Sequence, residues 1–370
     1  MNKKLNVIAY YLPQYHTIPE NDKWWGDGFT EWVNVKKAKP LFKDHKQPNI
    51  PAPELGYYNL LDDNVRRKQS ELAKEAGIDG FCYWHYWFGG EDRQLLEKPF
   101  EMTLKDKENK FGFCLGWANE SWKAKQWNKD GLGDVILMEQ KYLGEDDDEK
   151  HFYAFLNAFK DERYLKYNGK PIFLIYRPLQ HPYLAKFLSF WNELAKKNGF
   201  NDGFCFIAEL GSHYKSEHVT FLIHEGFNYV TVDRMNMGEA PFLYKCYFVI
   251  KNYLLNRPKR VIDYKEFLPW AYTKRDNIQG ILPGICPNWD HSPRSGKKCS
   301  ILHNSTPELF YKLVRKTLMI NNQNRQLPIM FIKSWNEWGE GNYLEPDTVF
   351  GKEYIYALRR ALKECSRLGI

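Results

Sequence analysis

Short apolar runs alternate along the chain with longer amphipathic stretches, and each run has the length of one buried strand. Eight runs are expected as strands, at Val7–Tyr11, Gly80–Trp84, Phe111–Leu115, Ile172–Tyr176, Phe204–Ala208, Tyr229–Val232, Ile281–Ile285 and Ile329–Ser334. The stretches between them predict helices at Asn64–Ala76, Asp147–Phe159, Tyr183–Asn198, His213–Gly226, Thr306–Asn321 and Lys352–Leu368. Strands that alternate with helices are typical of a parallel sheet covered by helices.

Eight strands, each followed by a helix, predict a (β/α)8 TIM barrel of the α/β class. We expect residues 1–370 to form this single catalytic domain, with long βα loops over its carboxyl face. A doubly wound sheet is the rival fold, but no glycine-rich phosphate loop follows an early strand. Because such barrels carry their chemistry at the carboxyl ends of the strands, the residues that follow each strand are the candidates for a functional site.

Polar residues and tryptophans concentrate at these strand ends. In chain order they are Gln14 and His16; His85 and Trp87; Trp117, Asn119 and Glu120; Arg177; Glu209 and His213; Asp233 and Arg234; Asn288, Trp289, Asp290 and Arg294; and Asn336, Glu337 and Glu340. Tyr11, Trp84, Trp122 and Trp338 complete the predicted substrate-binding set. A long segment after the first strand adds Trp25 and Glu31, and it either contributes to the site or plugs the barrel mouth.

The last apolar run breaks into two carboxylates, Glu337 and Glu340, set among tryptophans and glycines. A carboxylate pair can supply the acid and the base that glycosidic-bond chemistry needs. The indoles of Trp335 and Trp338 would suit the apolar faces of sugar rings. The alternative is a solvated turn after a buried strand, which two tryptophans beside two glutamates make unfavourable.

Composition adds an excess of aromatic residues, 16%, and a formal net charge of +7. Aromatic side chains fit both a core and stacking on carbohydrate. The basic surface fits an anionic polysaccharide, a lipid diphosphate or a membrane, and also ordinary solubility. No nucleic-acid partner is expected.

The segment Tyr244–Leu255 is aromatic and apolar and precedes Arg257, Lys259 and Arg260. It is either a site of peripheral membrane contact or a helix packed on the core, and we favour core packing. No apolar run reaches the length of a membrane span. Because the short apolar stretch at the N-terminus has no small-residue cleavage site, we expect a cytoplasmic protein, with the inner face of the membrane as the place of any contact.

The seven cysteines form no CxxC pair, so they are expected to be buried thiols. The histidines, for example His85, His213 and His291, are scattered singly, which disfavours a metal enzyme. No cofactor is expected.

Five separated motifs resemble the WbsX-like proteins of bacterial surface-polysaccharide loci, which are related to the endo-α-1,2-mannosidases and mannanases of glycoside hydrolase family 99. They are Ala9–His16, Asn21–Trp32, Gly80–Phe88, Trp117–Trp122 and Asn336–Gly341. They occur in order and span nearly the whole chain. The resemblance implies a (β/α)8 barrel and a retaining mechanism without a glycosyl ester on the enzyme.

In this implied mechanism Glu337 deprotonates the sugar 2-hydroxyl, which attacks the anomeric carbon to form a 1,2-anhydro sugar. Glu340 protonates the leaving oxygen and later activates water. Glu340 is then expected to hold a proton at neutral pH, and Glu337 to stay ionised near donors such as Asn336 and Arg294. Trp338 and Tyr343 are expected to form an apolar wall.

The expected substrate is an α-linked bacterial surface polysaccharide or a lipid-linked oligosaccharide, and both hydrolysis and transfer fit. One alternative is a sugar-nucleotide-dependent glycosyltransferase of O-antigen or capsule synthesis. The only DxD motif, Asp146–Asp148, is better explained as the acidic start of a helix than as a metal site. A catalytically inactive glycan-binding protein is the alternative from another class.

Overall fold

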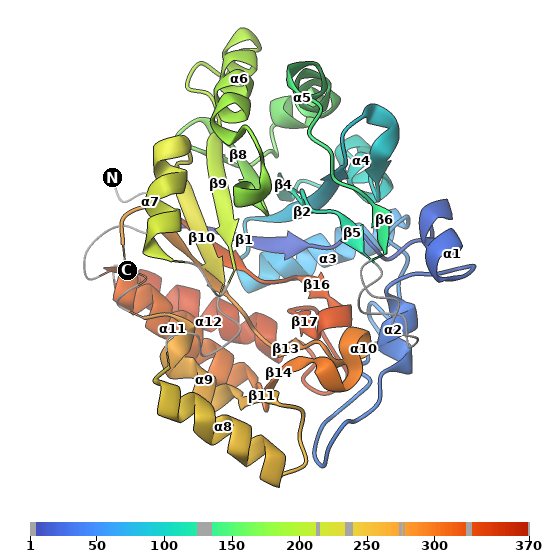
Figure 1. Ribbon diagram of the computed structural model, residues 1–370, viewed down its shortest axis with the longest axis vertical. Helices are drawn as coiled ribbons and strands as arrows, with labels where there is room; N and C mark the ends of the chain where they lie inside the picture. Colours follow the sequence, from blue (N-terminus) through green and yellow to red (C-terminus); the bar gives the residue numbers. More distant parts are fainter. Residues whose placement is uncertain are drawn as a thin grey trace.

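The computed structural model describes residues 5–123, 135–211, 215–233, 240–273, 276, 278–322 and 328–368. Within them, eight parallel strands close into a barrel (Figure 1): β1 (Asn6–Tyr11), β2 (Gly80–Trp87), β4 (Gly112–Trp117), β8 (Lys170–Ile175), β9 (Cys205–Leu210), β10 (Tyr229–Asp233), β12 (Ile281–Ile285) and β15 (Ile329–Ile332). Strand β1 pairs with both β15 and β2, which closes the ring. The predicted (β/α)8 barrel is confirmed.

The barrel strands are buried on both faces, as their nearly continuous apolar sequences require. Every predicted strand overlaps an observed one. Strands β2 and β4 continue past their predicted ends by three and two residues, to Trp87 and Trp117. These two indoles therefore belong to strands and not to loops after them.

Helices surround the barrel in the predicted positions: α3 (Asp63–Ala76), α5 (Glu145–Lys160), α6 (Leu184–Lys197), α7 (Ser216–Glu225), α11 (Pro307–Asn322) and α12 (Glu353–Arg367). Shorter helices that the sequence pattern did not resolve are α4 (Lys98–Lys105) and α9 (Tyr264–Ala271). Helix α3 is capped by Asp62, whose side chain accepts a hydrogen bond from the Asn64 amide. The described part of the chain contains no helix that is both long and apolar enough to cross a bilayer.

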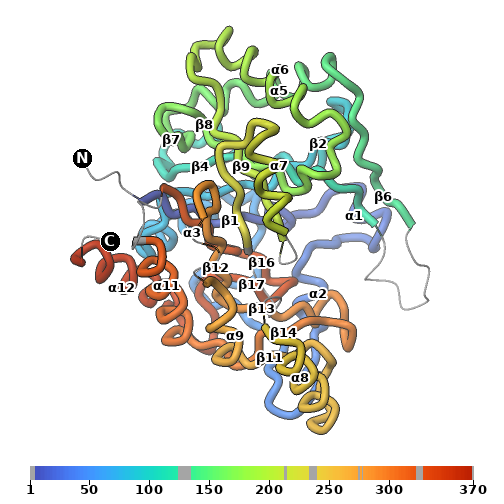
Figure 2. The backbone as a smooth tube through the Cα atoms, turned by 60° about the vertical axis from the view of Figure 1, so that its left-hand side comes forward, coloured from blue at the N-terminus to red at the C-terminus, as the bar shows by residue number. Residues whose placement is uncertain are grey.

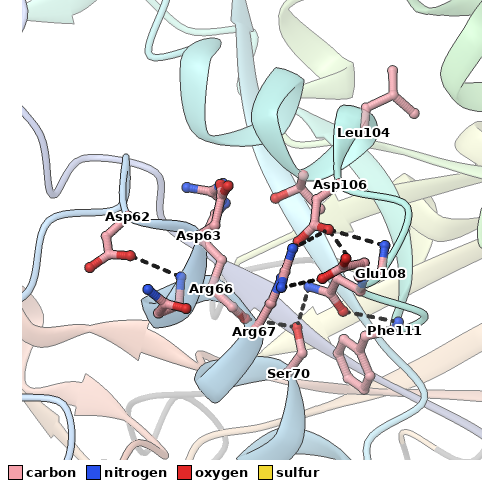
Figure 3. A network of polar contacts seen from close by, with 12 residues as sticks. Asp62, Asp63, Arg66, Arg67, Ser70, Leu104, Asp106, Glu108 and Phe111 are labelled. Carbon is pink, nitrogen blue, oxygen red and sulfur yellow. Dashed lines mark hydrogen bonds and ion pairs between the residues drawn. The ribbon is translucent and has the colours of Figure 1, made fainter.

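A polar network joins α3 to the loop between α4 and β4 (Figure 3). Arg67 donates two hydrogen bonds to the Asp106 carboxylate, at 2.8 and 2.9 Å, and pairs with Glu108. Ser70 accepts a hydrogen bond from the Asn109 amide at 3.0 Å. These contacts fasten the helix to its neighbouring loop and involve none of the predicted site residues.

The loops at the carboxyl ends of the strands contain their own small elements. After β1 come α1 (Pro19–Trp25) and α2 (Trp32–Lys37), and after β4 come β5 (Trp122–Lys123) and β6 (Ile136–Met138). After β12 come β13 (Trp289–Asp290), α10 (Ser292–Ser295) and β14 (Ser300–His303). Strand β14 also pairs with β11 (Arg260–Asp263), which follows α8 (Phe242–Leu254). In both views α8 lies at the end of the molecule opposite α6 (Figures 1 and 2).

Candidate active site

The segment after β15 turns back on itself and is held to the first strand. Asn336 and Glu337 form β16, which pairs with β17 (Asn342–Tyr343), and a short 3-10 turn carries Glu340 between them. The Asn336 side chain accepts a hydrogen bond from the Leu12 amide at 2.7 Å and donates one to the Leu12 carbonyl at 3.0 Å. The Tyr15 hydroxyl donates to the Asn336 carbonyl and accepts from the Trp338 amide. Hydrogen bonds thus hold the residues on both sides of Glu337, Asn336 and Trp338, and thereby fix the position of Glu337.

Two glycines of this segment allow close approach by other elements. A Cβ on Gly339 would lie 2.6 Å from Glu31 Cδ and 3.0 Å from Arg294 Nε. Gly341 has a φ of +53°, and a Cβ there would lie 2.7 Å from Asp290 Cβ. Gly339 thus leaves room for Glu31 and Arg294, and Gly341 leaves room for Asp290.

Arg294 on α10 contacts three carboxylates at once. Its Nη1 donates to Glu340 Oε1 at 2.7 Å and its Nη2 to Glu337 Oε1 at 2.7 Å. Its Nε donates to Glu31 Oε1 at 3.0 Å, and Nη2 lies 2.9 Å from Glu31 Oε2. The Arg294 side chain is 12% exposed and that of Glu31 is fully buried. The guanidinium of Arg294 therefore positions Glu337 and Glu340, and Glu31 binds the same guanidinium through its Nε and Nη2.

The pKa values of the two candidate catalytic carboxyls are shifted in opposite directions. Burial, together with the charges of Glu340 and Glu31 and against the effect of Arg294, raises the pKa of Glu337 to about 8. Burial acts the same way on Glu340, but Arg294 and His291 outweigh it and lower its pKa to about 2. These opposite shifts favour the proton on Glu337, whereas the sequence analysis expected it on Glu340.

Glu337 and Glu340 line a cavity of about 600 Å³ at the carboxyl ends of the strands. Of the other predicted residues, Gln14, Trp25, Trp84, Glu120, Trp122, Arg177 and Arg294 also line it. Arg177 donates from Nε to Glu120 Oε2 at 2.9 Å, so these two opposite charges are paired in the wall. The cavity combines indole faces with charged groups, the composition expected of a carbohydrate site.

Several predicted substrate contacts are buried tryptophans outside the cavity wall. Trp87 donates its indole N–H to Asp147, and Trp117 donates to the Trp87 carbonyl. Trp338 stacks on Tyr343 with ring centroids 3.7 Å apart and donates to Glu345 at 2.6 Å. Trp335 is also fully buried. The prediction that these indoles stack on sugar is corrected, because their partners hold them in the core.

Tyr11, His16 and His85 are likewise core residues. The Tyr11 hydroxyl donates to Gln69 at 2.6 Å. His16 lies with Nδ1 3.0 Å from the Pro13 carbonyl, and burial lowers its pKa to about 4. His85 lies with Nε2 2.9 Å from His151 Nε2, and burial lowers its pKa to about 3. Both histidines are therefore neutral structural groups and not substrate contacts.

The remaining predicted polar residues do not line the cavity themselves but contact residues in or next to its wall. Asn119 bonds both the amide and the carbonyl of Arg177, at 2.7 and 3.0 Å. Glu209 lies 3.5 Å from Lys333 Nζ, and Asp290 bonds the Ser292 amide at 2.9 Å and His45 Nε2 at 2.8 Å. With Glu31 and Asn336, these residues position the groups that line the cavity. His213 and Arg234 lie outside the described residues, as does the side chain of Asp233.

The cavity also contains residues that the sequence analysis missed, among them Tyr10, Tyr86, Tyr176, His291, Lys333 and Ser334. Tyr10 precedes the predicted Tyr11, and since side chains alternate along a strand, only one of the two can face the barrel interior. Tyr86 was missed because β2 was expected to end too early. His291 was noted only as a single histidine, although its Nε2 lies 3.6 Å from Glu340.

The acidic run Asp146–Asp148 forms the first turn of α5, as expected of a helix start. Asp147 accepts hydrogen bonds from the Trp87 indole and from the Gly90 amide at 2.8 Å. Across the described ranges, no group of three or more His, Cys, Asp or Glu side chains is placed to hold a metal ion.

Comparison with solved structures gives the same fold. The GH99 endo-alpha-mannosidase from Bacteroides thetaiotaomicron superimposes with a TM-score of 0.60 at 14% identity, over 98% of this chain and 99% of that one. A glycoside hydrolase-like protein superimposes with a TM-score of 0.62 at 13% identity, over 98% and 94%. At these identities the likeness shows the barrel architecture.

Comparison of sequences gives the family. The uncharacterized protein WxcX of Xanthomonas campestris pv. campestris is 34% identical over 366 residues, which are 96% of this chain and 49% of that protein. The chain thus spans about half the length of the curated relatives it matches. The family model described as glycosyltransferase WbsX matches residues 7–358. The chain therefore belongs to the WbsX glycosyltransferase family.

Proposed function

We propose that this protein is a carbohydrate-active enzyme that cleaves or transfers an α-linked glycosidic bond of a bacterial surface polysaccharide or its lipid-linked precursor. The observation that carries the proposal is the pair Glu337 and Glu340, bound to one guanidinium and exposed to an aromatic-walled cavity. Two carboxyls with pKa values of about 8 and about 2 can hold one proton between them over a wide pH range. One acid and one base is what glycosidic-bond chemistry requires.

The reaction we propose retains the anomeric configuration through the sugar 2-hydroxyl. Ionised Glu337 takes the 2-hydroxyl proton while O2 bonds to C1, and the C1–O bond to the leaving group breaks as Glu340 gives that oxygen a proton. Glu340 then takes a proton from water or from an acceptor hydroxyl, whose oxygen bonds to C1. The C1–O2 bond breaks, and Glu337 returns its proton to O2.

This assignment requires the proton to lie on Glu340 when substrate is bound, whereas the pKa shifts of the two carboxyls without substrate favour Glu337. Arg294 is the group that can change how the proton is distributed between the two carboxyls, since it donates a hydrogen bond of 2.7 Å to each. A 2-hydroxyl placed against Glu337 would compete for the same oxygen, and a leaving oxygen placed against Glu340 would favour its neutral form. The reverse assignment, with Glu337 as the acid and Glu340 as the base, predicts different activities for Glu337→Gln and Glu340→Gln.

A nucleotide-dependent glycosyl transfer is the second candidate, because the family model describes a glycosyltransferase. Arg177, Lys333 and Lys123 line the cavity and are cations of the kind that bind a diphosphate. The acidic run Asp146–Asp148 does not support metal-dependent binding of that diphosphate, because Asp147 is buried and bonded to Trp87 and Gly90.

Product analysis separates these candidates. Wild-type protein, Glu337→Gln and Glu340→Gln are incubated with the surface polysaccharide of the source bacterium, with and without sugar nucleotides, and the products are analysed by mass spectrometry. Glu162→Gln is the matched control, because Glu162 is exposed and pairs only loosely with Lys110 at 3.6 Å. Fragments made without nucleotide by wild type and Glu162→Gln alone support the proposal. Chain extension that requires nucleotide favours the second candidate, and glycan binding that is unchanged in both site variants, with no product, indicates an inactive binding protein.

Aryl glycosides of the cleaved sugar distinguish the two roles. A phenol of low pKa leaves without a proton from the enzyme, so the variant that lacks the acid keeps activity on such substrates. Activity that survives in Glu340→Gln and is lost in Glu337→Gln supports the assignment above. The opposite pattern exchanges the two roles.

A further inference from the structure

Helix α8 exposes an apolar face that the rest of the described structure leaves uncovered. Phe242, Leu243, Tyr253 and Leu254 are 77%, 81%, 84% and 75% exposed, and Tyr247, Val249 and Ile250 are at least half exposed. At 100° per residue these side chains fall on one side of the helix. Phe248 and Asn252 are buried on the other side. The segment is therefore a helix that packs on its neighbours through one side, as we favoured, but most of its apolar side chains are exposed and not in the core.

The inner side of α8 is firmly attached, so the exposed face has a defined orientation. Phe248 packs with Ile262 of β11 and Trp270 of α9. The Asn252 side chain donates to the carbonyls of Lys259 and Val261, at 3.1 and 2.8 Å. Strand β11 in turn pairs with β14, which pairs with β13 in the loop that carries Arg294. The helix is part of the folded domain and lies at its lower end (Figure 1), and its apolar side chains are exposed.

The segment that contains α8 is basic. Residues 240–262 contain Lys245, Lys251, Arg257, Lys259 and Arg260 and no aspartate or glutamate. Lys251 pairs with Asp263 and Glu266, each at 3.0 Å, and Arg257 lies 3.9 Å from Asp263. Lys259 and Arg260 are exposed where the chain leaves the helix. The surface thus combines exposed tyrosine, phenylalanine and leucine side chains with cationic residues.

We propose that α8 is an interfacial helix that binds this protein to an anionic lipid bilayer. Its apolar side enters the boundary between headgroups and acyl chains, with aromatic rings at the depth they favour, and the basic residues contact the lipid phosphates. A symmetric contact between two copies would bring the basic segments of both together, which is electrostatically unfavourable. The proposal is independent of the chemistry assigned to Glu337 and Glu340.

Vesicle co-sedimentation tests this proposal. The 370-residue chain is mixed with vesicles of phosphatidylglycerol and phosphatidylcholine in equal amounts, and with vesicles of phosphatidylcholine alone. Wild type is expected to bind the anionic vesicles at least about tenfold more tightly than the neutral ones, and less tightly as salt is raised. The triple variant Leu243→Gln, Ile250→Gln, Leu254→Gln is expected to lose at least about tenfold in affinity, because three apolar side chains no longer enter the bilayer.

The matched control is Leu143→Gln combined with Leu368→Gln, which replaces leucines that are also more than half exposed but lie elsewhere. Both sets of substitutions should leave the melting temperature unchanged, since the side chains are exposed. Wild-type protein that does not bind anionic vesicles overturns the proposal, as does a triple variant that binds like the control. A wild-type dimer that the triple variant converts to monomer, without vesicle binding, assigns the face to a second copy of the chain instead.

Discussion

Replacing Arg294 by glutamine tests whether one guanidinium holds the site together. The substitution removes the partner of Glu31, Glu337 and Glu340 and leaves a neutral amide in its place. Glu31 is fully buried, so its charge loses compensation that water cannot replace. Removing one partner of a buried ion pair typically destabilises a protein by about 3–5 kcal/mol.

The expected loss of stability converts to a change in melting temperature through the size of the domain. Unfolding entropy is about 2.1 cal/mol/K per residue, or about 0.8 kcal/mol/K for 370 residues. A loss of about 3–5 kcal/mol then lowers the melting temperature by about 4–6 °C. Calorimetry or circular dichroism measures this directly. The matched control is Arg360→Gln, whose partner Glu308 is about half exposed, so its effect should stay below about 1 kcal/mol.

The effect should also depend on pH, with a sign that follows from Glu340. Its pKa in the folded protein, about 2, is below the ordinary value of 4.5, so its ionised form stabilises the fold above that ordinary value. This contribution is lost as the pH falls toward 2. Without Arg294 the pKa of Glu340 should rise, and the contribution disappears.

The deficit of Arg294→Gln relative to wild type is therefore expected to be larger at about pH 7.5 than at about pH 3, because wild type loses most of the Glu340 contribution between these values. A melting temperature within about 1 °C of wild type, or a deficit that is the same at both pH values, would refute the idea that Arg294 compensates these carboxylates.

Three further predictions concern the turn, the tryptophans and the shared proton. Gly339→Ala should lower stability by about 1–3 kcal/mol and reduce turnover, because its Cβ would collide with Glu31 and Arg294. The control is Gly211→Ala, where a Cβ meets nothing within 4 Å. Equal changes in melting temperature for the two variants would contradict the close packing at Gly339. Trp25→Ala should weaken glycan binding with little change in melting temperature, because Trp25 lines the cavity. Trp117→Ala should cost about 3–5 kcal/mol of stability, because Trp117 is buried. Titration calorimetry measures the binding and thermal melts the stability, and weaker binding in Trp117→Ala with lower stability in Trp25→Ala would contradict both placements. The value of kcat/KM should fall above about pH 8, as Glu337 loses the proton that it shares with Glu340. The melting temperature, measured over the same pH range, is the control for unfolding. A kcat/KM that stays constant to about pH 10 would show that this proton is not required.

The sequence by itself determined the barrel, because a buried parallel strand leaves a strong local signal. Each strand is a short apolar run between amphipathic helices, and all eight runs overlap observed strands. The start of α11 is similarly local: Thr306 accepts a hydrogen bond from the Leu309 amide, and Pro307 is the first helical residue. The pair Glu337 and Glu340 could also be found, since it follows the last strand in an unusual mixture of tryptophan and glycine.

Only the tertiary structure decided which residues face the cavity. Tyr10 lines it and Tyr11 does not, because one residue along a strand reverses the side-chain direction. Trp87 and Trp117 are core residues because their strands extend further than the apolar pattern indicated. The sequence contains no signal for the distance between Arg294 and Glu31, which lie far apart along the chain.

The tertiary structure also decided the protonation of the pair and the exposure of α8. The pKa of a carboxyl depends on burial and on charges brought together by folding, so the positions of Arg294 and His291 determine which of Glu337 and Glu340 is neutral. An apolar helix has the same sequence pattern whether its face meets the core or the outside. Which of the two holds for α8 depends on what the barrel packs against it, and the described structure packs β11 and α9 against the opposite side.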